Sequence, residues 1–105
     1  MKIKKGVVLA GVQIQMNSVL VEAEKLWAEN GQELVVTAGL DGEHSKGSLH
    51  YPGYALDLRT RYFPAEEHQA IADELQERLG SEYDVVVHKS HIHVEWDLAK
   101  KYLRG

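Results

Sequence analysis

The sequence contains no cysteine, which excludes a disulfide framework and any metal site built on thiolates. It also lacks an apolar run long enough to span a membrane. No cluster of lysine and arginine stands out, and the formal net charge is −4. An acidic chain without a basic patch is not expected to bind the phosphate backbone of a nucleic acid. These absences leave an ordinary globular composition, with 44% hydrophobic and 27% charged residues.

The 105 residues suffice for one hydrophobic core, and the chain shows no repeat, low-complexity segment or linker. We therefore expect a single domain over residues 1–105, present as a monomer. Near the start, three lysines precede an apolar run at residues 6–12, as in a very short signal sequence. The run is at the lower limit of length, and no clean cleavage site follows it. A first strand, or a lead into the first helix, is the favoured interpretation.

Two stretches have the periodicity of amphipathic helices. In residues 17–30, apolar side chains recur at helical spacing, and Gly31 is suited to the turn that ends the helix. A second helix is predicted from Pro64 to about Leu79, with Gly80 after its end. Its buried stripe is expected to consist of His68, Ile71, Ala72, Leu75 and Leu79.

Four stretches favour β-structure, at residues 32–37, 54–60, 83–87 and 91–96, and the last two are close enough for a tight hairpin. Alternation places Asp57 on the strand face opposite Leu56 and Leu58. In the same way His93 lies opposite Ile92 and Val94. We predict an α+β domain in which two main helices pack on a small antiparallel sheet. Residues Trp27, Tyr83 and Trp96 are expected in the core.

Five of the six histidines fall in two places, residues 44–50 and 88–93, and Asp57 follows His50 by seven positions. Histidine nitrogens with one carboxylate are ligands that zinc prefers. Three protein ligands and a water are the usual composition of a catalytic zinc site. We expect such a site on His50, Asp57 and His93.

Hydrolysis at this site would use a metal-activated water together with a group that transfers a proton to the leaving amine. The histidines expected nearest to this task are His88 and His91, while His44 could orient the water or the oxyanion. Glu95 shares the face of His93 and could instead fix the tautomer of a ligand.

Each of these residues also has a purely structural interpretation. Alternating histidines on a strand occur by accident, and His68 is assigned a surface or hydrogen-bonding role. Arg59 and Arg61 could bind a substrate carboxylate, although structural salt bridges are the favoured role for both.

The stretch Ser48-Leu-His50-Tyr-Pro-Gly53-Tyr-Ala-Leu-Asp57 resembles the first zinc motif, Ser-x-His-x-x-Gly-x-Ala-x-Asp, of one superfamily. That superfamily joins D-alanyl-D-alanine metallopeptidases, lysostaphin-type peptidases and the hedgehog signalling domain. The second motif, His91-Ile-His93, resembles the His-x-His of the hedgehog domain and of murein endopeptidases, and His44-Ser45 also matches the hedgehog site. The resemblance extends over about residues 17–97. It implies the hedgehog/DD-peptidase fold, zinc on the three expected ligands, and His91 close to the metal water.

The resemblance further implies a compact phage or prophage enzyme acting on peptidoglycan peptides. Without a convincing signal peptide, we expect it to be cytoplasmic until released, or associated with the virion. One departure matters, because the carboxypeptidases carry an acid where this chain has Ser90. Many hedgehog-like members carry a glutamate at the place of His88 or Val87, whereas murein endopeptidases have a histidine at that of His88. We therefore expect a histidine-assisted zinc metallopeptidase, either a carboxypeptidase or an endopeptidase. The alternative is a catalytically inactive, zinc-stabilised binding or virion structural module of the same fold.

Overall fold

The computed structural model describes residues 1–40 and 53–97 of the chain. The elements in order are β1 (Lys2–Ile3), α1 (Met16–Glu29), β2 (Val35–Ala38), β3 (Ala55–Arg59), a 3₁₀ helix (Ala65–Glu67), α2 (His68–Leu79), β4 (Tyr83–Val87) and β5 (His91–Trp96). Within the described residues, no helix combines the length and the apolar character that crossing a membrane would require.

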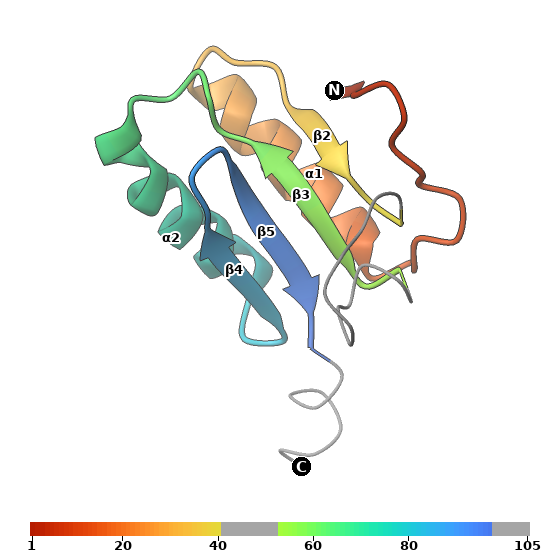
Figure 1. Ribbon diagram of the computed structural model, residues 1–105. Helices are drawn as coiled ribbons and strands as arrows, with labels where there is room; N and C mark the ends of the chain where they lie inside the picture. Colours follow the sequence, from red (N-terminus) through yellow and green to blue (C-terminus); the bar gives the residue numbers. More distant parts are fainter. Residues whose placement is uncertain (41–52, 98–105) are drawn as a thin grey trace.

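The strands form one sheet in the order β1-β2-β3-β5-β4, and α1 and α2 cover the same face of it (Figure 1). The α+β prediction of two helices on a small sheet is thus confirmed. Strands β2, β3, β5 and β4 pair antiparallel, as expected, but β1 pairs parallel with β2. The parallel pair arises because α1 lies between β1 and β2 and returns the chain to the same end of the sheet. The first strand is also earlier than residues 6–12, which contain turns and irregular backbone.

The core fills the space between the sheet and the helices. The sheet contributes alternate residues such as Leu56, Leu58 and Ile92, and α1 contributes Trp27, all at most 1% exposed. The indole Nε1 of Trp27 donates to the carbonyl oxygen of Arg59 at 3.3 Å. This bond joins α1 to the end of β3. Because the buried residues of each strand point to the helices, their neighbours in sequence face the other side, which we call the open face.

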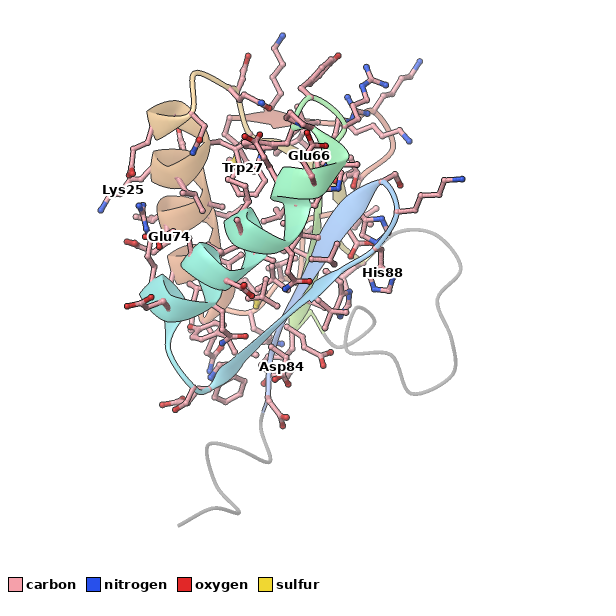
Figure 2. The ribbon with its side chains drawn as sticks, turned by 90° about the vertical axis from the view of Figure 1, so that its left-hand side faces the viewer. Lys25, Trp27, Glu66, Glu74, Asp84 and His88 are labelled. Atoms are coloured by element: carbon pink, nitrogen blue, oxygen red, sulfur yellow. The ribbon has the colours of Figure 1, made fainter. Side chains whose placement is uncertain are left out.

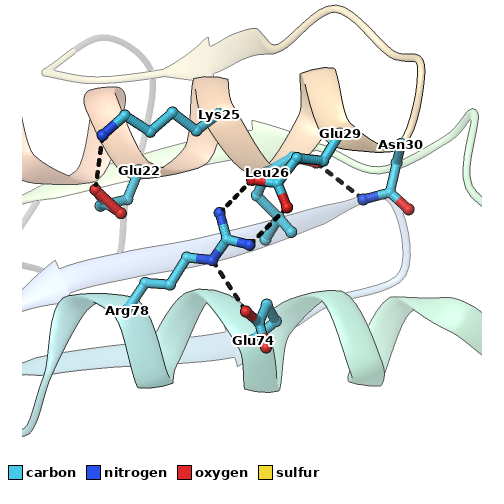
Figure 3. A network of polar contacts seen from close by, with 7 residues as sticks. All are labelled: Glu22, Lys25, Leu26, Glu29, Asn30, Glu74 and Arg78. Atoms are coloured by element: carbon cyan, nitrogen blue, oxygen red, sulfur yellow. Dashed lines mark hydrogen bonds and ion pairs between the residues drawn. The ribbon is translucent and has the colours of Figure 1, made fainter.

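Both helix ends follow the prediction. Gly31 and Gly80 have φ values of +70° and +93°, a region that favours glycine. The two helices are joined on their exposed side by Arg78, whose guanidinium donates to both Glu29 oxygens at 2.8 Å and to Glu74 Oε1 at 3.0 Å (Figure 3). The hydrogen bond from Arg78 holds the pKa of the Glu29 carboxyl below its usual value.

Candidate metal centre

The candidate site lies on the open face where β3 and β5 run side by side. The antiparallel register pairs Asp57 with His93 and Arg59 with His91. This register is fixed by the opposite face, because a slip of one residue would turn the buried Leu56 and Val94 toward water. The core thus dictates which polar side chains meet on the open face.

Asp57 and His93 are in direct contact. Asp57 Oδ1 lies 3.0 Å from His93 Nδ1, and the other ring nitrogen of His93, Nε2, lies 3.3 Å from Glu95 Oε2. The second Asp57 oxygen, Oδ2, lies 3.6 Å from His91 Nε2. The side chains of Asp57 and His93 are only 13% and 19% exposed, so this contact is partly shielded from water. One carboxylate therefore faces two imidazoles, one of which also has a second acidic neighbour.

The electrostatics of His93 follow from this arrangement. Burial of the ring disfavours the imidazolium and would lower the pKa of His93. Hydrogen bonds to Asp57 and then to Glu95 outweigh burial, so the pKa of His93 is raised above its ordinary value. A pair of carboxylates that stabilises a proton on His93 creates negative potential, which also attracts a metal cation.

His88 and His91 stand beside this pair. Their rings stack with centroids 4.8 Å apart and an interplanar angle of 18°, and His88 lies edge-on to His93 at 6.2 Å. Figure 2 shows His88 on the side of the sheet away from the helices. The hairpin brings the two rings together, because the backbone N–H of His88 donates to the carbonyl of His91 at 2.9 Å. The predicted hairpin is confirmed, and it sets three imidazoles in one patch.

Four of the six predicted site residues are thus described, and they lie together: Asp57 and His93 among the metal ligands, and His88 and His91 among the catalytic candidates. The remaining two, His44 and His50, lie outside the described residues, as do Ser45, Ser48, Tyr51 and Pro52. Within residues 1–40 and 53–97, no three histidine or acidic side chains are arranged to hold a metal ion. The zinc site therefore stays a prediction.

The two described ligand candidates, Asp57 and His93, can be compared with one half of such a site. In a tetrahedral zinc site with metal–ligand bonds of about 2.0–2.2 Å, neighbouring ligand atoms lie about 3.3–3.6 Å apart. Asp57 Oδ1 and His93 Nδ1 are at a hydrogen-bond distance of 3.0 Å, so a small outward movement of the two side chains would make room for the ion. With Nδ1 turned toward Asp57, the opposite nitrogen of His93 faces Glu95, the orientation typical of a metal-binding histidine held by a second carboxylate. Glu95 thus contacts His93 on the strand face that the sequence predicted for both residues.

His68 lies elsewhere, at the start of α2, where its Nε2 is 3.0 Å from the carbonyl oxygen of Phe63. This confirms its hydrogen-bonding role, although its side chain is less buried than Ile71, Ala72 and Leu75 of the predicted stripe. Trp27 and Trp96 are buried, and Tyr83, which packs against the core, donates its hydroxyl to the carbonyl of Gln15 at 2.9 Å. None of these residues contributes to the open face.

Two features of the site were not predicted from the sequence: the hollow beside Asp57 and the presence of Lys4 in its lining. A hollow of about 300 Å³ adjoins Asp57 and is lined by Lys4, Thr37, Arg59, Arg61 and Ser90. Lys4 arrives there because its backbone N–H donates to Val36 at 2.9 Å and so continues the β1–β2 pair. The predicted salt bridges of the two arginines are not formed with any described carboxylate. No local pattern links Lys4 to Arg59, since only the sheet order brings them together.

Comparison with known proteins gives one partial similarity. The chain is 33% identical over 81 residues to Indian hedgehog B protein of Danio rerio, an alignment that includes 75% of this chain. The chain spans about a fifth of the length of that relative, since the match includes 19% of it. No family model matches the chain. The similarity agrees with the hedgehog part of the resemblance and does not extend to peptidases or to phage proteins.

Proposed function

We propose that this protein is a zinc-dependent metallopeptidase that hydrolyses peptide bonds of bacterial cell-wall peptides. The observation that carries the proposal is the contact between Asp57 and His93, with the stacked rings of His88 and His91 beside it. A carboxylate and three imidazoles on one partly exposed patch provide both metal ligands and proton carriers. Clusters of titratable side chains with shifted pKa values gather at functional sites, which supports a catalytic role for this patch.

The metal would be held by Asp57 and His93, with His50 as the third ligand expected from the sequence. When bound, zinc supplies a Lewis acid and lowers the pKa of a coordinated water. Glu95 would accept a hydrogen bond from the N–H at His93 Nε2 and so direct the lone pair of Nδ1 toward the metal. These roles leave His88 and His91 available for proton transfer.

His91 is the better placed of these two histidines. Its Nε2 is near Asp57, while its Nδ1 is 3.5 Å from the hydroxyl of Ser90. His88 is exposed and stacked on His91, so it can exchange protons with bulk water. We infer that His91 carries the proton toward the leaving amine and that His88 assists it. Ser90, which replaces an acid of the carboxypeptidases, then acts only through its hydrogen bond to His91.

The test combines metal content with hydrolysis. Untagged protein is purified without added metal, loaded with zinc and incubated with muropeptides, and new amino groups are followed by mass spectrometry. We expect about one zinc per chain and cleavage of a stem-peptide bond. His93→Ala should lose both, and His91→Ala should keep zinc but lose at least tenfold in rate. His68→Gln is the matched histidine control. Bound zinc without cleavage of any muropeptide would contradict the enzymatic proposal.

A second candidate function is a zinc-stabilised binding or virion structural module without catalysis. The replacement of the carboxypeptidase acid by Ser90 favours it. It predicts that binding to purified peptidoglycan survives in the His88→Ala/His91→Ala double variant while zinc is retained. Loss of binding together with loss of hydrolysis would favour the enzyme.

A further inference from the structure

The hollow beside Asp57 has an unusual charge for this chain. Three of its lining residues, Lys4, Arg59 and Arg61, are cations, although the chain as a whole has a formal charge of −4. Across residues 1–40 and 53–97, none of the three forms an ion pair. Asp57 is the one acid among the described residues of the lining, so cations are in excess. A concave surface with an excess of cations attracts an anion, and the low-dielectric walls strengthen that attraction.

The donors of the hollow suit a carboxylate. An arginine guanidinium presents paired N–H groups that match the two oxygens of a carboxylate, and a lysine adds a point charge. Thr37 and Ser90 contribute hydroxyl groups to the same lining. The guanidinium of Arg61 is held in place, because its Nη2 donates to the Tyr62 hydroxyl at 2.8 Å and its carbon lies 4.9 Å from the Tyr62 ring centre.

Arg59 also lines a second hollow, of about 400 Å³, together with Lys2, Gln32 and Tyr62. The side chain therefore borders open space on two sides. A ligand can reach it from the direction of Asp57 without displacing a protein group that pairs with it. Arg59 is the residue of the cluster most directly connected to the candidate metal centre.

The register of the sheet sets the distance between this cluster and the candidate metal centre. Arg59 is two residues from Asp57 on β3 and is the cross-strand partner of His91 on β5. Two residues along a strand correspond to about 6.6 Å. In a peptide, the carbon of a terminal carboxylate lies about one residue, roughly 3.8 Å, beyond the preceding carbonyl. The first distance exceeds the second by about 3 Å, which the long side chain of Arg59 can span. Its guanidinium can therefore hold the terminal carboxylate while the preceding peptide bond lies against Asp57 and His91.

The opposite end of the site has the opposite charge. Glu95 pairs with Ala55 on β3 and with Asp84 on β4, so the acids gather on the side of Asp57 away from Arg59. A substrate carboxylate would be repelled there and attracted at the Arg59 end. This charge gradient favours one direction for a bound peptide across the open face, with its C-terminal carboxylate at the Arg59 end.

We propose that Lys4, Arg59 and Arg61 form a subsite for the free C-terminal carboxylate of a peptide, which makes the site that of a carboxypeptidase rather than an endopeptidase. The mode of cleavage rests on the proposed function, whereas binding of the carboxylate does not. Hydrolysis adds one water across the last peptide bond, with OH to the carbonyl carbon and H to the amine of the released amino acid.

Three synthetic peptides test the subsite with the zinc-loaded protein. The first is N-acetyl-Lys-D-Ala-D-Ala with a free terminal carboxylate, and the second is its terminal amide. The third is an amide whose last residue is D-Glu, so that the carboxylate is on the side chain. We expect kcat/KM for the free acid to exceed that of both amides at least tenfold, equivalent to about 1.4 kcal/mol. Equal rates for the first two peptides would overturn the proposal, and equal rates for the first and third would move the anchor to a side chain.

Variants assign the effect to the cluster. Arg59→Gln should reduce the preference for the free acid to less than threefold, and Lys4→Gln should reduce it by a smaller factor. Arg78→Gln and Lys25→Gln, which remove cations on the helix side of the molecule, should leave the preference intact. Circular dichroism melting of each variant verifies the fold, and Arg59→Lys gives a second, milder change at the same position.

Binding separates this proposal from the proposed function. Calorimetric titration of the zinc-loaded protein with the first two peptides requires no turnover. If neither peptide is cleaved but the free acid binds at least tenfold tighter, and Arg59→Gln removes the difference, the subsite stands and the peptidase proposal fails. If both peptides bind equally, the subsite is refuted whether or not either peptide is cleaved.

Discussion

At the scale of single residues, Thr60 stands out among the buried polar side chains of the described residues. It is 1% exposed, and within the described part of the chain its Oγ1 has no hydrogen-bond partner. Its backbone is well held, since the N–H donates to Ser90 at 3.3 Å and the carbonyl accepts from Phe63 at 2.9 Å. The hydroxyl therefore lowers stability locally, directly after the end of β3 and three residues from Asp57.

Thr60→Val is expected to raise the free energy of unfolding by about 1 kcal/mol, because it replaces an unsatisfied buried hydroxyl with a methyl group of similar size. Urea denaturation measures the change. Thr60→Ser is the matched control, since it keeps the hydroxyl and loses a methyl group, and it should lower stability by about 0.8 kcal/mol. A loss of stability in Thr60→Val would mean that the hydroxyl has a partner, such as a buried water, and would contradict this account.

For single residues, the sequence predicts which strand face each side chain of the candidate site lies on, but not which side chains meet. The two-residue period placed Asp57, His91, His93 and Glu95 on polar strand faces, and the structure confirms this. Their mutual contacts depend on which strands are neighbours, and strand order is a property of the whole fold. The roles of His44 and His50 remain predictions from the sequence.

At the scale of elements, the outer strand β4 is closed by one side chain of α2. Gln76 Oε1 accepts the N–H of Val85 at 3.0 Å, and Gln76 Nε2 donates to the carbonyl of Tyr83 at 2.7 Å. The amide thus imitates a further strand along the outer edge. An edge strand with unpaired backbone groups invites pairing with other chains, and Gln76 reduces that tendency while it fixes α2 against the sheet.

Gln76→Ala is expected to lower the free energy of unfolding by about 1–2 kcal/mol, because it leaves two partly buried backbone groups without partners. Hydrogen exchange of the Val85 amide should accelerate as well. Gln69→Ala on the same helix is the control, since Gln69 only contacts the exposed Asp73 and should change stability by less than about 0.5 kcal/mol. Equal effects of the two substitutions would show that the edge contact contributes nothing.

The elements that the sequence predicted well are those with local signals. The second helix, with Gly80 after it, and the hairpin around Lys89 follow from periods and turn residues within a short window. Strand β1 has only two residues and pairs with a strand more than thirty positions away, so its signal is too short to detect. The hollow beside Asp57 escaped detection for the same reason, because Lys4 arrives with β1.

At the scale of the molecule, the two faces of the sheet have different roles. One face packs on α1 and α2 and provides the core, while the open face carries titratable groups that contribute little apolar burial. The domain is small, and its core alone gives a modest stability margin. A metal that ties β3 and β5 to the segment containing His50 would therefore affect the stability of the whole fold.

Zinc loading is accordingly expected to stabilise the protein. A ligand that binds only the folded state at one hundred times its dissociation constant adds about 2.7 kcal/mol. For a domain of this size each kcal/mol raises Tm by about 4 °C or more, so we expect a shift of at least about 10 °C between chelator-treated and zinc-loaded protein. Asp57→Asn, His93→Ala and His50→Ala should each abolish most of the shift, whereas His68→Gln should retain it. Scanning calorimetry measures all five proteins, and an unchanged Tm in the wild type on addition of zinc would argue that these residues are a hydrogen-bonded surface cluster without a metal.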